Sequence, residues 1–339
     1  MANVVFGRGP GARALGITIM LVAGCGGREG DNAFVNGPSS GTGQTTGGTN
    51  NIVTTTGTGT SGEGGMVIAP PIGDLVPAES GGYKLGPAIT GAGVTDTGLN
   101  GAAGEQGCGL LAGVVRDFKG FDQPGGHPDF QHFGGNDKTT GIVGPDIGPD
   151  AKPVYASKCE AAPAQGACPF GQQTTSKTDF DQWYRVTENV NKPYLIYFQF
   201  MPAGGGGQVT FDSKRFFPLD GAGWMDSGGD EDGKLHNFAF TTELHTKFKY
   251  AGGEKFTFRG DDDLWVFVNG KLGLDLGGLH TPVEGTLDLD ASANNLGITK
   301  GGTYSLELFH AERHTRASNF RVDTTLVFVD CGTIPPDIH

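Results

Sequence analysis

The chain has 339 residues, 61 of them glycine, and a formal net charge of −13. This acidic balance argues against a nucleic-acid partner, because gripping a phosphate backbone requires clustered Lys and Arg. All three tryptophans and 20 of the 22 phenylalanines lie after residue 110. The material for a hydrophobic core is therefore in the C-terminal two-thirds of the chain.

Residues 1–24 are typical of an export signal. Two arginines precede a short apolar run, and the small pair Ala23-Gly24 leads directly into Cys25. An apolar run of this length is too short to span a bilayer. Residues 21–25 resemble a bacterial lipobox, in which the cysteine is lipidated; an ordinary signal peptide that contains a cysteine is the alternative. Because glycine rather than aspartate follows Cys25, we expect a lipid-anchored protein at the outer membrane or cell surface.

The following stretch, residues 25–107, is predicted to be a disordered linker. Its first half is dominated by Gly, Thr, Ser, Asn and Gln, and Gly and Pro stay frequent up to residue 107. Such a composition cannot bury enough apolar surface to offset the loss of chain entropy on folding. We expect it to act as a flexible tether.

Residues 108–335 are predicted to form an all-β domain, most simply an antiparallel β-sandwich. Short apolar runs recur there between Gly, Pro, Asn and Asp clusters, and few segments have helical spacing. Asn269-Gly270 separates two apolar runs and predicts a tight hairpin. The expected strands are residues 194–200, 208–211, 237–243, 255–258, 264–268, 272–276, 303–309 and 320–329.

Four cysteines remain in the predicted domain. An even number in an exported chain indicates two disulfides, for which three pairings exist. Cys159 and Cys168 are close enough in sequence to close a small loop. We favour that pair together with Cys108–Cys331, which brackets the aromatic-rich region. Free or metal-bound thiols are the alternative, and they are less expected outside a reducing compartment.

Three consecutive carboxylates, Asp261, Asp262 and Asp263, precede the first strand of the predicted hairpin. Ca²⁺ takes about six to eight oxygen ligands, so clustered carboxylates suit it. Neighbouring residues on a regular strand point to opposite faces, and two adjacent aspartates can share an ion only where the backbone departs from β geometry. A solvated acidic loop, paired with Arg259 or capping local turns, is the alternative.

Several segments of the domain resemble the fibro-slime domain of extracellular and surface proteins. They are FFPLDG at 216–221, the long run at 236–280, and LFHAERHTRASNFRVDTTL at 308–326. That domain is similar to the PA14 domain, a β-sandwich found in adhesins, toxins and glycosidases. In PA14 lectins two adjacent aspartates joined by a cis peptide coordinate a Ca²⁺ that also binds sugar hydroxyls. The resemblance places this pair on Asp261 and Asp262, while Asp263 replaces a small residue.

The resemblance also implies further site residues. Additional Ca²⁺ ligands are expected from Asp263, Glu312 and Asn319, and for each of them a structural salt bridge or turn hydrogen bond is the alternative. The histidines around Glu312 lack the spacing of a zinc motif. The expected carbohydrate contacts are His280, Arg313 and His314, with Arg316 as a further candidate for a sugar or an acidic partner. Trp224 is added from its position in the glycine-rich acidic loop 220–234, where it is a candidate for stacking on a sugar ring.

No nucleophile elbow, Cys/His pair, phosphate-binding loop or zinc motif stands in a credible context. We therefore expect a binding protein and no enzyme: a tethered surface lipoprotein that binds a polysaccharide or glycoprotein of the cell surface or matrix in a Ca²⁺-dependent way. Its only membrane contact would be the lipid anchor. A structural slime protein that self-associates is the alternative, and a glycoside hydrolase is a more distant one.

Overall fold

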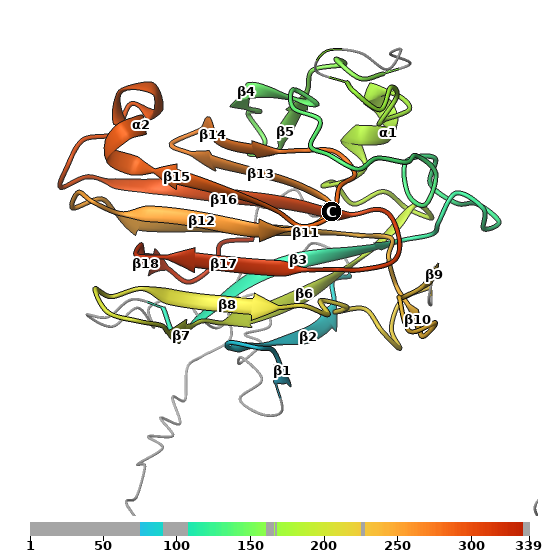
Figure 1. The fold of residues 1–339 in the computed structure, drawn as a ribbon, viewed down its shortest axis with the longest axis horizontal. Coiled ribbons are helices and arrows are strands. Elements are labelled where there is room, and N and C mark those ends of the chain that lie inside the picture. The colour runs from blue at the N-terminus through green and yellow to red at the C-terminus, as the bar shows by residue number, and fades with distance from the viewer. Residues whose placement is uncertain (1–74, 91–107, 161–165, 167, 225–227, 335–339) are drawn as a thin grey trace, which may run out of the picture. The chain divides into compact units, whose positions relative to one another are not determined.

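The alternation of apolar and polar residues produces two antiparallel β-sheets that pack face to face, which confirms the predicted all-β sandwich. The computed structural model describes residues 75–90, 108–160, 166, 168–224 and 228–334. Figure 1 shows the strands of both sheets running in roughly the same direction, as in an aligned sandwich. The predicted export signal and Cys25 lie outside the described residues.

The larger sheet has β11 and β16 at its centre. These two strands are paired over their whole length, from Phe240 opposite Glu312 to Lys249 opposite Thr303. In spatial order the strands are β1 (Val76–Pro77), β2 (Gly82–Ala88), β6 (Asn191–Gln199), β3 (Leu110–Phe118), β11 (Phe240–Lys249), β16 (Thr303–Glu312), β13 (Asp263–Val268), β14 (Lys271–Leu276), β4 (Val143–Ile147) and β5 (Pro153–Tyr155), with β18 (Val327–Asp330) also paired to β11.

The smaller sheet covers one face of the larger one, and a short separate strand pair and two short helices complete the described elements. The strands of the smaller sheet are, in order, β15 (Val283–Asp288), β12 (Lys255–Gly260), β17 (Phe320–Thr324), β8 (Val209–Ser213) and β7 (Met201–Pro202); the separate pair is β9 (Gly228–Gly229) with β10 (Leu235–His236); the helices are α1 (Lys177–Asp181) and α2 (Leu289–Leu296).

Apolar side chains fill both faces of the larger sheet. Between the sheets, Phe211 and Phe320 of the smaller sheet pack with Leu308 of β16 in a phenylalanine-rich core. On the opposite face, the segment that contains β4, β5 and α1 contributes Trp183 to a second core with Phe309. Because successive residues of a strand point to opposite faces, β16 is buried on both sides. Full burial of each large apolar side chain contributes about 1.5 to 3 kcal/mol.

The predicted hairpin and both favoured disulfides are confirmed. Strands β13 and β14 pair antiparallel, and Asn269 and Gly270 between them have φ values of 51° and 75°. A turn with positive φ at both positions favours Asn-Gly, which matches the twist of the flanking strands. The disulfides are Cys108–Cys331, which joins the segment before β3 to the segment after β18, and Cys159–Cys168.

Three expectations about elements need correction. Residues 76–88 carry β1 and β2, and β2 pairs with β6, so this part of the predicted linker is folded. The single strand expected at 320–329 is divided into β17 and β18, which join different sheets. Helix α2 was not expected: Asp288 caps its N-terminus by accepting from Ala291 N, and Gly297 ends it in the left-handed region.

Within the part of the chain that the structure describes, no helix has the length and apolar character needed to cross a membrane.

Candidate functional site

The register between β13 and β16 brings the acidic residues together. Asp263 lies opposite Ala311, so the residues next to them, Asp262 before β13 and Glu312 at the end of β16, are also neighbours. In an antiparallel pair, opposite residues lie about 5 Å apart. Two carboxylates that are 50 residues apart in sequence thus meet at one end of the sandwich because the strands pair in this register.

Backbone and side-chain donors hold the first two aspartates. The Asp261 carboxylate accepts from the Asn319 backbone N–H, and from Asn319 Nδ2 at 2.9 Å. The Asp262 carboxylate accepts from the N–H groups of His280 (3.2 Å) and Arg313 (3.1 Å). The peptide bond between Asp261 and Asp262 is cis. Both side chains are almost fully buried, with 4% and 5% of the residue surface exposed.

Asp261, Asp262 and Glu312 form an acidic cluster, and Glu312 has the fewest hydrogen bonds of the three. It is fully buried, and neither carboxylate oxygen has a well-formed hydrogen bond. The Ser318 hydroxyl and the His314 backbone N–H lie near enough to favour the charged form slightly, but the hydroxyl donates to the Phe216 carbonyl at 2.8 Å. Burial first, and then the charges of Asp262 and Asp261, raise the pKa of Glu312 well above its usual value.

The same causes act on the other two carboxylates. Burial, followed by the neighbouring Asp261 and Asp263 charges, raises the pKa of Asp262 well above its ordinary value. Burial also raises the pKa of Asp261, although its bonds from Asn319 oppose the effect. Ionising all three carboxylates would therefore gather negative charge in a place that is poor in water, and a bound cation would favour the charged forms.

Asp263 has a different role from the two aspartates before it. Its carboxylate accepts from Arg313 Nε and from the Gly278 N–H, each at 2.6 Å, and both charged side chains are fully buried. These partners occupy Asp263 in an internal ion pair. The expectation of Asp263 as a metal ligand has no support in this geometry.

Arg313, expected to contact carbohydrate, faces the interior. Its guanidinium donates from Nη1 to the carbonyls of Gln173 (2.9 Å) and Asp129 (3.3 Å) and lies 4.6 Å from the centre of the Trp183 ring. Only 1% of the residue surface is exposed. The expected sugar contact is therefore wrong, because the guanidinium of Arg313 already bonds to Asp263 and to two backbone carbonyls.

A pocket of about 280 Å³ opens directly above Asp261 and Asp262. His280 and His314, both expected as carbohydrate contacts, line it. Arg316, a further candidate for contact with a sugar, is exposed in the same wall. The loops after β14 and β16 thus deliver donors and acceptors around the acidic cluster.

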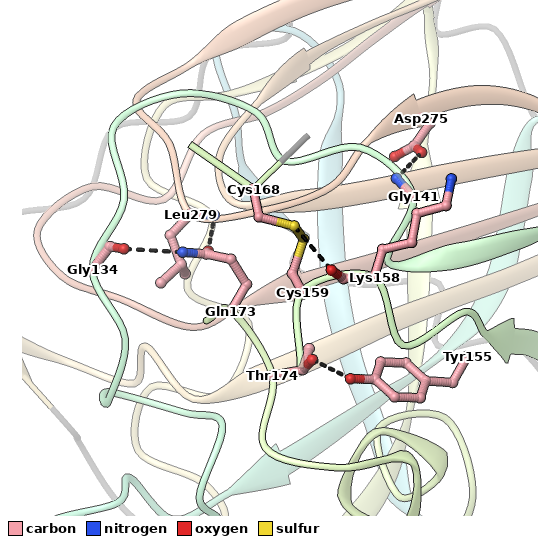
Figure 2. Close-up of a disulfide and its surroundings, with 10 residues drawn as sticks. All are labelled: Gly134, Gly141, Tyr155, Lys158, Cys159, Cys168, Gln173, Thr174, Asp275 and Leu279. Atoms are coloured by element: carbon pink, nitrogen blue, oxygen red, sulfur yellow. Dashed lines mark hydrogen bonds between the residues drawn. A yellow bond between two sulfur atoms is a disulfide. The ribbon is translucent and has the colours of Figure 1, made fainter. Parts of the chain in front are cut away.

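Figure 2 shows the Cys159–Cys168 disulfide together with the neighbouring Gln173, which bonds to two loops of the pocket wall. Gln173, which follows the Cys159–Cys168 loop, donates from Nε2 to Gly134 O at 3.1 Å and accepts at Oε1 from Leu279 N at 3.3 Å. Gly135 and Leu279 belong to the pocket lining. One buried amide therefore ties together two loops that form the pocket wall.

Trp224, the expected stacking residue, does not line the pocket. Its ring instead lies below the Lys192 ammonium (4.5 Å) and the Lys119 ammonium (5.1 Å), and its backbone N–H donates to the Asp117 carboxylate. This prediction was wrong because Trp224 packs against Asp117 of β3 and the two lysines, outside the pocket lining.

His310 of β16 is a positioning residue. It is fully buried among aromatic rings, and its Nε2 donates to the Asp261 carbonyl at 2.9 Å. Burial lowers the pKa of His310 to about 4, so the imidazole is neutral at physiological pH. It supports the backbone of the acidic cluster without adding charge to it.

The donor chemistry of the acidic cluster fits a hard cation. Among the described residues, no three His, Cys, Asp or Glu side chains already stand in metal-ligand geometry. Asp261, Asp262 and Glu312 nevertheless supply only oxygen donors, and the orphaned Glu312 oxygens have lone pairs to offer. Oxygen ligands of this kind suit Ca²⁺ and exclude a preference for soft metals.

Comparison with known proteins identifies the C-terminal part of the domain. Residues 219–338 match the PA14 domain family. The PA14 match contains the whole hairpin and all three members of the acidic cluster. The sandwich expected from the resemblance and the PA14 match agree on the fold.

Curated relatives of the chain come from Dictyostelium discoideum. Protein psiD is 37% identical over 196 residues, which are 57% of this chain and 37% of psiD. Protein psiH is 45% identical over 126 residues, which are 34% of this chain and 16% of psiH. The chain thus spans well under half of these relatives. Because they are eukaryotic proteins, the bacterial lipoprotein stays a prediction.

Solved structures also include PA14 domains. A PA14 sugar-binding domain from an RTX adhesin is 11% identical, with a TM-score of 0.26, and the match covers 66% of this chain and 96% of that one. The PA14 domain of the antifreeze protein MpAFP is 12% identical, with a TM-score of 0.19 and coverage of 29% and 53%.

Proposed function

We propose that this protein binds carbohydrate at the cell surface in a Ca²⁺-dependent way, at the pocket above the acidic cluster. The observation that carries the proposal is the cluster itself: three buried carboxylates, of which Glu312 has no well-formed hydrogen bond, at the base of an open pocket. The nearest buried cation, Arg313, is already paired with Asp263. A divalent cation offsets this charge and leaves coordination positions that face the pocket.

The residues around the ion have separate tasks in this proposal. Asp261, Asp262 and Glu312 hold Ca²⁺, and Asn319 and His280 fix the orientation of the two aspartates. When bound, Ca²⁺ supplies positive charge that attracts the hydroxyl oxygens of a sugar.

Side chains of the pocket rim contribute direct hydrogen bonds. His314 and Arg316 line the rim and carry the donors that a polyhydroxylated ligand accepts from. A shallow pocket with a few directed polar groups is a common form of ligand site.

The match to PA14 domains supports carbohydrate binding or adhesion as the general class. We propose binding without turnover, since the pocket is organised around charge neutralisation and not around an acid and base pair. We further propose that a lipid on Cys25 anchors the chain, so that the sandwich projects from the membrane toward polysaccharide or glycoprotein partners. Radiolabelled-palmitate incorporation, lost in Cys25→Ser, tests the anchor separately.

Calorimetric titration of the full chain with CaCl₂ tests the metal site. We expect Asp261→Asn/Asp262→Asn to abolish binding, because two of the three charged ligands are lost. Ca²⁺ at about 100 times its Kd should stabilise the parent by about 2.7 kcal/mol. The control Asp122→Asn/Asp137→Asn removes two exposed carboxylates and the same charge, and it should bind Ca²⁺ like the parent.

An array of neutral glycans, which lack the ammonium group of amino sugars, tests the second half of the proposal in Ca²⁺ and in EDTA. Binding seen only in Ca²⁺, and only without the Asp261/Asp262 changes, is the expected result. A parent protein that neither binds Ca²⁺ nor gains thermal stability from it would refute the metal site. Glycan binding that survives EDTA would refute the Ca²⁺ dependence.

A further inference from the structure

A second pocket, of about 430 Å³, lies on the outer face of the larger sheet, far from the acidic cluster. Glu307 lines this second pocket and Glu312 belongs to the acidic cluster, and both are on β16. Five residues along a strand span about 17 Å, so the two sites are separate. Glu307 shares its face of the sheet with Phe309, which is part of the second core. The second pocket therefore begins where the segment that contains β4, β5 and α1 no longer covers the sheet.

The floor of the second pocket is a histidine and a glutamate on neighbouring strands. His245 of β11 is directly opposite Glu307 of β16. Glu307 has 7% of its surface exposed, and its Oε2 has no hydrogen-bond partner. Burial raises the pKa of Glu307, and bonding to Ser305 only partly opposes this. An unsatisfied buried acceptor costs free energy, which a ligand that donates a hydrogen bond recovers.

The wall of the second pocket is anchored to its floor. One wall is the turn around Ala151, which is closed by a 2.8 Å bond from Gly148 N to Lys152 O. The Lys152 ammonium continues inward to the buried Glu243 carboxylate, which also bonds His245. Because the Glu243 carboxylate fixes both the turn and the floor, the second pocket is preformed. A ligand therefore binds with little loss of side-chain and loop entropy.

The charge of this anchor is internally balanced. Burial opposes ionisation of Glu243, but Lys152, Arg116 and His245 outweigh it and hold the pKa of Glu243 well below its usual value. Arg116 Nη1 lies 2.6 Å from the Glu243 carboxylate. Glu243 is thus fully engaged beneath the floor, and Glu307 remains as the acceptor that a ligand can use.

The lining has more acids than bases. Asp150, Glu307 and Asp330 contribute three carboxylates, against two basic side chains, Lys247 and His245. Asp150 pairs with Arg185 at 2.7 Å, and Asp330 accepts from the Thr333 hydroxyl at 2.7 Å. Glu307 is the carboxylate of the lining with an oxygen left over, so the ligand group that complements it is a cationic donor.

We propose that the second pocket binds the ammonium group of an amino sugar, with Glu307 as its acceptor. The hydroxyls of Ser305 and Thr333 in the lining complement sugar hydroxyls, and Pro149 and Ala151 offer an apolar wall for the ring. The volume is sufficient for a monosaccharide and part of its neighbour. This site works without Ca²⁺ and does not depend on the proposed function of the first pocket.

Calorimetric titration of the full chain with D-glucosamine, in EDTA, tests the assignment. We expect glucosamine to bind, and the neutral probes N-acetyl-D-glucosamine and D-glucose to bind at least about tenfold more weakly, because they lack the ammonium that pairs with Glu307. Glu307→Gln keeps the shape of the side chain and should weaken glucosamine binding by a similar factor. The control Glu284→Gln removes the same charge from an exposed position on β15 and should bind like the parent.

A second variant keeps the test decisive if Glu307→Gln does not fold. Thr333→Arg, at an exposed position, brings its own cation to the second pocket and should abolish glucosamine binding while the melting temperature stays unchanged. Equal binding of glucosamine and glucose, or full binding by either pocket variant, would overturn the proposal. Methylammonium binding as tightly as glucosamine would overturn the assignment to a sugar.

Discussion

Removing the Arg313 side chain should destabilise the whole sandwich, although this residue lies next to a proposed binding site. In Arg313→Met, the buried Asp263 carboxylate loses its 2.6 Å ion pair, and the carbonyls of Gln173 and Asp129 lose their donor. Breaking a buried pair by removing one partner costs about 3 to 5 kcal/mol, because the other charge stays buried. The thioether of methionine retains part of the packing on Trp183. We expect a loss of about 4 kcal/mol in the free energy of unfolding.

Urea unfolding at pH 7, followed by far-ultraviolet circular dichroism, measures this loss. The double variant Asp263→Asn/Arg313→Met should recover part of it, because the stranded charge is gone. The control Arg316→Met removes an exposed arginine from the pocket rim and should change stability by about 0.5 kcal/mol at most. A loss below about 1 kcal/mol for Arg313→Met, or a double variant as unstable as the single one, would refute the assignment of Arg313 to the fold.

Two further predictions concern pH and the disulfides. Because the folded-state pKa values of Asp262 and Glu312 are raised, their stabilising contribution is complete below the ordinary carboxyl range near about pH 4 and is lost as pH rises through the raised values. The melting temperature in EDTA should therefore fall between about pH 5 and neutrality, and saturating Ca²⁺ should reduce this fall. Asp262→Asn/Glu312→Gln should also make the fall smaller, and an unchanged slope in that variant would contradict a contribution from these two carboxyl groups. Cys108→Ser/Cys331→Ser should cost about 2 to 5 kcal/mol in urea unfolding, and Cys159→Ser/Cys168→Ser less, since the first pair closes a separation of 223 residues and the second one of 9. The reverse order of the two losses would contradict the loop-closure argument.

Local sequence patterns were sufficient to predict most of the sandwich. The apolar runs before and after Asn269-Gly270 became β13 and β14, because the alternation and the turn chemistry indicated the same hairpin. Helix α2 had local signals too: Asp288 at its start and Gly297 after its end are common capping residues. These signals were missed because the helix is short and lies between strands.

Errors arose where a segment takes its structure from a distant partner. Residues 82–88 contain three glycines or prolines, a composition that suits a linker, yet they form β2 because the edge of β6 offers backbone partners. Val327–Asp330 continues the apolar run of β17 but joins β11 of the other sheet. Neither strand pairing can be predicted from the local sequence.

By itself, the sequence determined that Asp261 and Asp262 enter the hairpin at a loop end, since the strand period and the turn depend on neighbouring residues only. The tertiary structure decided which other groups meet them. It placed Glu312 in the cluster through the β13–β16 register, gave Asp263 to Arg313, and turned Trp224 toward two lysines. These outcomes depend on burial and on contacts between residues that are far apart in the chain. The residue type shows what a side chain can bind. Only the packing of the fold shows which partner within the protein it already binds.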